Sequence, residues 1–176
     1  MKFPFGRQIA WDRSRKVEDT VLNVDLNRFA GKWYEIAAFP AWLKKGCRCG
    51  TAEFIHMDEY VVVRESCEKD GKLAVSAGRG YPVPGTGNSQ LKVRFVWPFK
   101  SDYWIIALDE QYRYAMVGHP DKKYLWIMSR TPRMDEDVYQ SLLNRALAKG
   151  YNVERLRRID QSCALGTPTS RETAEA

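Results

Sequence analysis

The chain has 176 residues, of which 44% are hydrophobic and 12% aromatic, and its formal net charge at pH 7 is +6. This length fits one domain that can bury a core without the help of a metal. The modest charge comes without a zinc-finger, helix-turn-helix or RNA-recognition motif, so nucleic-acid binding is not predicted. No apolar run approaches the roughly 18 residues of a membrane-spanning helix.

The beginning of the chain predicts a polar arm over residues 1–22. It contains basic residues but no continuous apolar stretch, so the sequence does not predict a signal peptide. Cys47 is the first cysteine, and no earlier one offers a site for a lipid anchor. We therefore expect a barrel domain over 23–163, between this arm and a disordered tail over 164–176.

Eight strand-like segments follow one another from residue 32 to residue 130. Each is rich in β-branched and aromatic residues, and turn-forming residues separate them. The gaps are too short for helical crossovers, which favours antiparallel up-and-down neighbours. Such a sheet can close into a barrel whose interior holds one small ligand. The expected strands are 32–38, 50–56, 60–67, 73–80, 90–97, 103–109, 112–117 and 124–130.

The hydrophobic period changes after the last of these segments. Apolar residues such as Leu142 and Ala146 recur at helical spacing, acidic residues precede them, and Gly150 is a typical C-terminal stop. This pattern predicts one amphipathic helix over about 135–149, which we expect to pack outside the sheet. Residues 151–158 can follow as a short final strand.

Alternation along the strands indicates which side chains face the interior. In the run 90–97, Lys92 and Arg94 mark the outer face, so the alternating set Leu91, Val93, Phe95 and Trp97 should point inward. One alternative stays open, in which half of the inward rings fill the interior and the cavity is small. The residues that we expect to line the interior are Phe39, Phe54, Phe95, Trp97, Tyr114, Met116, Trp126 and Met128.

Two motifs at opposite ends of the predicted domain are the most distinctive. The first is GKWYEIAAFP, with Trp33 near its start, and the second is YLWIMSRTP, with Arg130 near its end. A planar guanidinium stacked on an indole is worth about 0.5–2 kcal/mol when water is excluded. We expect these two side chains to meet and to seal one end of the barrel.

Together with the run DYWIIALDEQYRYAMVGHPDKKYLWIMSRTP, these motifs resemble the signatures of the lipocalin family. The subgroup they resemble comprises bacterial outer-membrane lipocalins, apolipoprotein D and plant temperature-induced lipocalins. The resemblance extends from about Val24 to Cys163. It implies an all-β fold, an eight-stranded antiparallel up-and-down β-barrel with one C-terminal α-helix packed outside and a short final strand. It also makes Trp33 and Arg130 a structural closure.

The resemblance implies binding rather than catalysis. Its members hold fatty acids, lysophospholipids or similar elongated apolar molecules, and the bacterial ones are linked to membrane maintenance. It therefore implies a lipid ligand and a location in the cell envelope, at the periplasm or outer membrane. The chain as given carries neither a signal peptide nor an anchor cysteine, which leaves the cytoplasm open.

A basic cluster follows the first predicted strand and is expected at the rim of the barrel. It consists of Trp42, Lys44, Lys45 and Arg48. These cations suit an anionic head group such as a carboxylate or a phosphate. The neighbouring Trp42 would also suit peripheral contact with an anionic membrane surface, but a solvated loop is the leading interpretation of this cluster.

Four cysteines favour two disulfides over a metal site, because neither histidine has ligand-like spacing to them. The family resemblance implies that Cys49 pairs with Cys163, which leaves Cys47 to pair with Cys67. The pairing of Cys49 with Cys67 stays open. Disulfides indicate an oxidising compartment.

Two other functions are open, an enzyme on the same scaffold and a haem carrier. The available acid–base groups are Glu35, Asp102, Tyr103 and Asp109, all equally explained as strand-end or surface groups. No catalytic motif accompanies them, so no catalytic residue is predicted. His56 ends a strand and His119 precedes a proline in a turn, so neither is well placed to bind haem. We predict no cofactor, no metal, and a monomer or homodimer.

Overall fold

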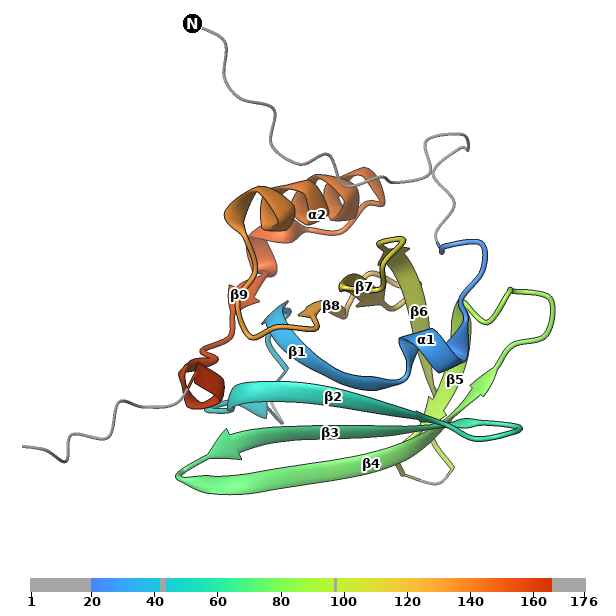
Figure 1. The fold of residues 1–176 in the computed structure, drawn as a ribbon, viewed down its shortest axis with the longest axis horizontal. Helices are drawn as coiled ribbons and strands as arrows, with labels where there is room; N and C mark the ends of the chain where they lie inside the picture. Colours follow the sequence, from blue (N-terminus) through green and yellow to red (C-terminus); the bar gives the residue numbers. More distant parts are fainter. Residues whose placement is uncertain (1–19, 42–43, 97, 166–176) are drawn as a thin grey trace, which may run out of the picture.

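The computed structural model describes residues 20–41, 44–96 and 98–165. Its main feature is one antiparallel sheet with the strand order β2-β3-β4-β5-β6-β7-β8-β1-β9, which closes because β1 also pairs with β2. Figure 1 shows the resulting barrel, with α2 lying outside the wall. The predicted eight-stranded up-and-down barrel is therefore confirmed, with β9 added beside β1.

The bounds of the elements agree with the sequence in most places. The predicted final strand shrinks to two residues, because a 3₁₀ turn, η2 (Val153–Arg155), takes up part of it. The strands are β1 (Gly31–Ala38), β2 (Arg48–His56), β3 (Val61–Lys69), β4 (Lys72–Pro82), β5 (Gln90–Arg94), β6 (Ser101–Leu108), β7 (Tyr114–Gly118), β8 (Leu125–Ser129) and β9 (Arg157–Arg158). The helices are α1 (Leu26–Phe29), α2 (Glu136–Ala148) and a second 3₁₀ turn, η3 (Ser162–Leu165).

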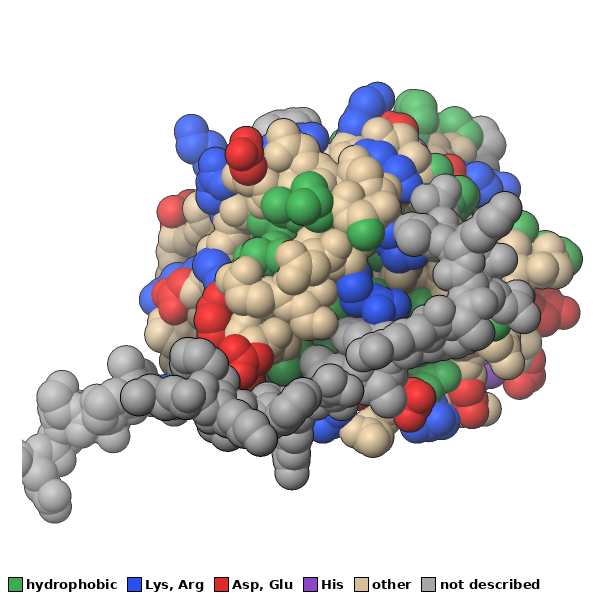
Figure 2. Space-filling model, turned by 90° about the horizontal axis from the view of Figure 1, so that it is seen from above, with side chains coloured by type: hydrophobic (Ala, Val, Ile, Leu, Met, Phe, Trp, Pro, Cys, Tyr) green, Lys and Arg blue, Asp and Glu red, His purple; other side chains and the backbone are tan. Residues whose placement is uncertain are grey.

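The helix α2 lies within the predicted range. Glu136 and Asp137 stand in its first turn, where negative charge favours the helix dipole, and Arg145 stands in the last. Its buried side chains include Leu142 and Ala146, which face the barrel. Seen from the side that carries α2, the surface mixes acidic, basic and hydrophobic side chains (Figure 2). None of the helices in the described part of the chain could cross a membrane.

The short helix α1, which the sequence analysis did not predict, covers one end of the barrel. Asp25 caps it by accepting hydrogen bonds from the backbone amides of Asn27 and Arg28. Phe29, its last residue, is 1% exposed and packs 4.9 Å from the ring of Phe54, measured between centroids. We call this end the floor and the opposite end, where the β1–β2 and β3–β4 connections lie, the mouth.

Buried side chains form two hydrophobic clusters, one on each face of the wall. The interior cluster includes Trp33, Phe54 and Met128. The outer cluster lies between the wall and α2 and includes Ile127 and Leu142. The inner face of β6, β7 and β8 packs in the interior cluster, and their outer face packs in the outer cluster. This double burial explains why these strands carry apolar residues on both faces.

The predictions that Tyr114 and Met116 point inward were wrong. Met116 is fully buried in the outer cluster, and Tyr114 packs against that cluster. The interior positions of β7 belong instead to Ala115 and Val117. Alternation alone could not decide between the two faces, because both are buried in this strand.

The prediction for Phe39 was wrong as well, and a register shift in β1 explains it. Glu35 pairs with Met128, but the pairing with β8 shifts between Glu35 and Ala37, so the side-chain alternation changes phase. Phe39 is therefore buried in the outer cluster, where its ring lies 6.4 Å from that of Tyr151. Phe39 therefore belongs to the packing between the barrel wall and α2, and not to the interior.

Two disulfides fasten the mouth. Cys47 is bonded to Cys67, with 5.5 Å between their Cα atoms, and Cys49 to Cys163, with 6.1 Å. These are the pairings that the family resemblance implied, and the alternative of Cys49 with Cys67 is not formed. The first bond ties the β1–β2 connection to β3. The second ties the start of β2 to the segment after β9.

Candidate functional site

The floor is closed by one cation on one aromatic ring. The guanidinium of Arg130 lies 3.9 Å over the ring of Trp33, whose indole N–H donates to the carbonyl of Phe29 at 2.9 Å. Arg130 also donates hydrogen bonds to backbone carbonyls from three parts of the chain. These belong to Arg28, Phe29, Lys32 and Tyr112. The two most distinctive residues of the sequence thus meet at the floor and leave the mouth as the entrance.

Towards the mouth, the interior contains a charged group of three side chains, which we call the mouth triad. Lys44 comes from the β1–β2 connection, and its Nζ lies 2.9 Å from Oε1 of Glu35 and 3.0 Å from Oε2 of Glu65. Glu35 is only 3% exposed. With all three groups ionised, the triad has one negative charge in excess.

Burial and mutual attraction shift the pKa values of these groups. Burial raises the pKa of Glu35, while the neighbouring Lys44 acts in the opposite direction. Burial by itself lowers the pKa of Lys44, but the two carboxylates outweigh it and raise that pKa above its ordinary value. Burial also raises the pKa of Tyr103 well above its ordinary value, with Glu65 and Glu35 adding to the effect. Lys44 is therefore a cation and Tyr103 a neutral phenol at pH 7.

A row of aromatic rings connects the floor with this triad. The ring of Tyr103 lies 5.9 Å from that of Phe54 and 5.8 Å from that of Trp126, and Trp126 in turn stacks on Tyr124 at 6.0 Å. The Nζ of Lys44 lies 5.9 Å from the centre of the Trp126 ring. The interior is thus apolar and aromatic along its length and charged near its opening.

Comparison with known proteins places the chain in a family. Residues 24–161 match the family model of the lipocalin-like domain. The chain belongs to the lipocalin family. Lipocalin membership supports the binding or transport of a small hydrophobic ligand inside the barrel.

Relatives of this lipocalin occur in plants and in bacteria. Temperature-induced lipocalin-1 of Arabidopsis thaliana is 32% identical over 170 residues, covering 91% of this chain and 90% of the relative. The outer membrane lipoprotein Blc of Escherichia coli K12 is 37% identical over 144 residues, covering 80% and 81%. The solved structure of insecticyanin from the tobacco hornworm Manduca sexta shares the fold, with a TM-score of 0.67 and 22% identity over 81% of this chain and 83% of that one.

Of the residues expected to line this lipocalin's interior, three are found there. Phe54 and Met128 belong to the buried interior cluster, and Trp126 packs against it. Phe95 follows the end of β5 and is 36% exposed, and it borders both the inward side of Gly78 and a groove lined by residues of the outer face. Trp97 lies outside the described residues.

The predicted basic rim is only partly formed. Lys44 turns inward into the triad, and Arg48 binds Glu68 with its Nε 3.0 Å from Oε1. Lys45 is exposed, as a rim residue should be, and Trp42 lies outside the described residues. Because two of the expected cations are paired with carboxylates, the rim offers less positive charge than the sequence suggested.

Sequence reasoning missed the acidic half of the mouth triad. Glu35 was named only as an available acid–base group and was not placed in the interior, and Glu65 was not considered. A signal was present, because Glu35 is two residues from Trp33 and Glu65 two residues from Val63. Residues two apart in a strand share a face, so both carboxylates had to point inward.

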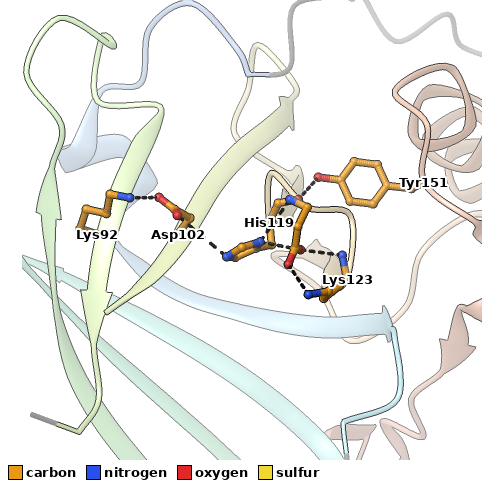
Figure 3. A network of polar contacts seen from close by, with 6 residues as sticks. Lys92, Asp102, His119, Lys123 and Tyr151 are labelled. Carbon is orange, nitrogen blue, oxygen red and sulfur yellow. Dashed lines mark hydrogen bonds and ion pairs between the residues drawn. The ribbon is translucent and has the colours of Figure 1, made fainter. Parts of the chain in front are cut away.

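The two histidines lie in polar networks at the surface. Nδ1 of His56 is 2.8 Å from Oδ1 of Asn27. Nδ1 of His119 is 2.6 Å from Oδ1 of Asp121, and Nε2 is 3.9 Å from Oδ2 of Asp102 (Figure 3). In the described part of the chain, no group of three or more histidine, cysteine or acidic residues could hold a metal ion. Neither histidine belongs to the interior cluster, so the geometry does not favour haem.

Proposed function

We propose that this lipocalin binds a single-chain lipid, a fatty acid or a lysophospholipid, with its alkyl chain inside the barrel and its head group at the mouth triad. The observation that carries the proposal is the aromatic row from Phe54 to Trp126, which ends at the partly buried Lys44. An apolar, aromatic interior with a charged end matches a molecule of the same polarity.

The energetic basis of binding is burial of the alkyl chain. Each buried CH₂ group is worth about 0.8 kcal/mol. A stretch of about ten carbons thus supplies roughly 8 kcal/mol before the entropic cost of association is subtracted. The aromatic side chains provide much of the contact surface, and Met128 adds a flexible one.

The charges of the triad favour a zwitterionic head over a purely anionic one. A phosphate can bind Lys44, while an amine on the same head group can bind Glu35 or Glu65. A fatty-acid carboxylate also meets Lys44, but it then lies beside two further carboxylates. We therefore propose lysophosphatidylethanolamine as the preferred class of ligand and fatty acid as the weaker one.

We further propose that the lipocalin works at membranes of the cell envelope, in their maintenance. Its two disulfides favour an oxidising compartment, and its bacterial relative is named as an outer membrane lipoprotein. Exposed apolar side chains at the mouth support peripheral contact with a lipid surface. Leu73 and Phe99 are each 74% exposed, and Lys72 and Lys100 are their exposed neighbours.

Calorimetric titration of delipidated protein tests the proposal. We expect saturable binding of one short-chain lysophosphatidylethanolamine per chain, below the concentration at which that lipid forms micelles. Glu65→Gln should weaken the lysophospholipid without weakening a fatty acid of equal length. Glu53→Gln is the matched control, because Glu53 pairs with Arg64 on the outer face. Absence of saturable binding of both lipids would exclude the proposal.

A further inference from the structure

The outer wall carries a groove that is separate from the lipid site. It lies on β3, β4 and β5, on the side of the barrel away from α2 (Figure 1). Val62, Arg79 and Arg94 are partners in the strand register, one on each strand. Their neighbours Val63 and Val93 belong to the interior cluster, so the three partners face outward. The groove has a volume of about 500 Å³ and is lined by Tyr60, Val62, Ala77, Gly78, Arg79, Tyr81, Arg94 and Phe95.

Two arginines in this groove lack a counter-charge. Arg79 and Arg94 stand directly opposite each other on neighbouring strands, an arrangement that is destabilising for like charges. Among the described residues, no carboxylate pairs with either guanidinium, and none lines the groove. The Nε of Arg94 is buried without a hydrogen-bond partner. A buried donor without a partner costs free energy, and an anion between the two arginines would relieve both costs.

Aromatic rings surround the two cations. The rings of Tyr60 and Tyr81 lie 6.0 Å apart, and the guanidinium of Arg79 is 4.9 Å from the centre of the Tyr60 ring. Phe95 borders Gly78, where an added Cβ would come within 2.6 Å of the carbonyl oxygen of Arg94. Glycine at this position therefore lets β5 approach β4 closely. The groove combines flat apolar surfaces with unpaired positive charge, as small-ligand sites do.

We propose that this groove is a second ligand site, which takes a small aromatic anion bearing a carboxylate or a phosphate. The acidic group binds between Arg79 and Arg94, whose planar guanidinium groups suit the oxygens of such anions. The aromatic body lies against Tyr60, Tyr81 and Phe95. The volume of about 500 Å³ is within the usual range of small-molecule pockets, about 300–1,000 Å³.

The test is an NMR titration of the ¹⁵N-labelled protein with 1-naphthyl phosphate. We expect saturable shifts at the backbone amides of Val62, Arg79 and Arg94, and the same shifts when the barrel already holds a lysophospholipid. Arg94→Gln and Arg79→Gln should each weaken binding by about tenfold or more, since each removes a charge-assisted hydrogen bond. Arg79 is exposed, so its replacement should not disturb the fold. Arg64→Gln, which removes a solvent-exposed charge from the outer face of β3, should leave the affinity unchanged.

Two ligand controls separate the parts of the proposal. Neutral 1-naphthalenemethanol should bind much more weakly than the phosphate ester, because it lacks the anion. Inorganic phosphate should also bind more weakly, because it lacks the ring. Equal affinity for inorganic phosphate, unchanged affinity in Arg79→Gln, or shifts confined to interior residues such as Met128 would each overturn the proposed site. These outcomes are independent of lipid binding in the barrel.

Discussion

The guanidinium of Arg130 lies 3.9 Å over the ring of Trp33, and the same side chain donates to the carbonyls of Arg28 and Phe29. One side chain therefore joins the end of β8 to β1 and to α1. Gly31 permits this approach, because a Cβ there would lie 3.3 Å from Nη1 of Arg130. The closure of the floor therefore depends on the contact between Arg130 and Trp33.

Trp33→Ala should lower the free energy of unfolding by about 3–5 kcal/mol, as other truncations of buried aromatic residues do. Trp33 is fully buried, so the change removes the platform of Arg130 and leaves a cavity. Arg130→Lys keeps the positive charge but loses the planar guanidinium with its several donors. It should lower the free energy of unfolding by less than Trp33→Ala does. Urea unfolding measures both. A loss below about 1 kcal/mol for Trp33→Ala would contradict this role, since that is the ordinary cost of a substitution.

The two disulfides should contribute unequally to stability. Cys49 and Cys163 are 114 positions apart, whereas Cys47 and Cys67 are 20 apart. The loop-entropy relation assigns about 5 kcal/mol to the longer loop and about 3 kcal/mol to the shorter. Replacing each pair by serines and measuring urea unfolding should therefore show the larger loss for the Cys49–Cys163 pair. The reverse order would mean that residual structure or native-state contacts outweigh chain entropy.

The sequence predicted the barrel well because its strands follow one another directly and alternate regularly. Trp126 and Met128 were placed correctly since β8 has no irregularity between them. The prediction failed for Phe39, where a register shift reverses the phase, and for Met116, whose strand is apolar on both faces. The register shift is not visible in residue type, and in β7 residue type does not distinguish the inner face from the outer one.

The charged mouth was harder to predict than the aromatic wall. Lys44 lies in a connection between strands, and alternation gives no information about the direction of a side chain outside a strand. Only the fold shows that this connection brings an ammonium group to Glu35 and Glu65. The inward carboxylates were visible in the pattern, but their partner was not.

Gly118 should not tolerate a side chain. A Cβ there would lie 2.2 Å from the hydroxyl oxygen of Tyr151, which donates to the carbonyl of His119 at 3.0 Å (Figure 3). Gly118→Ala should therefore cost about 1–3 kcal/mol, the usual range for overpacking. Tyr151→Phe removes the atom in closest contact, so the double variant should lose less than the sum of the single losses. Additive losses in urea unfolding would show that no steric conflict couples residues 118 and 151.

The mouth triad predicts how stability depends on pH. Burial raises the pKa of Glu35 above its ordinary value of 4.5, so the folded state holds this proton more tightly than the unfolded state. The resulting stabilisation is fully present below pH 4.5 and is lost as the pH rises through the folded-state pKa. Wild-type protein should therefore lose stability relative to Glu35→Gln between acidic and neutral pH. Urea unfolding at constant salt measures this difference, and Glu53→Gln on the outer face should keep the wild-type profile. Parallel profiles for wild type and Glu35→Gln would contradict the raised pKa.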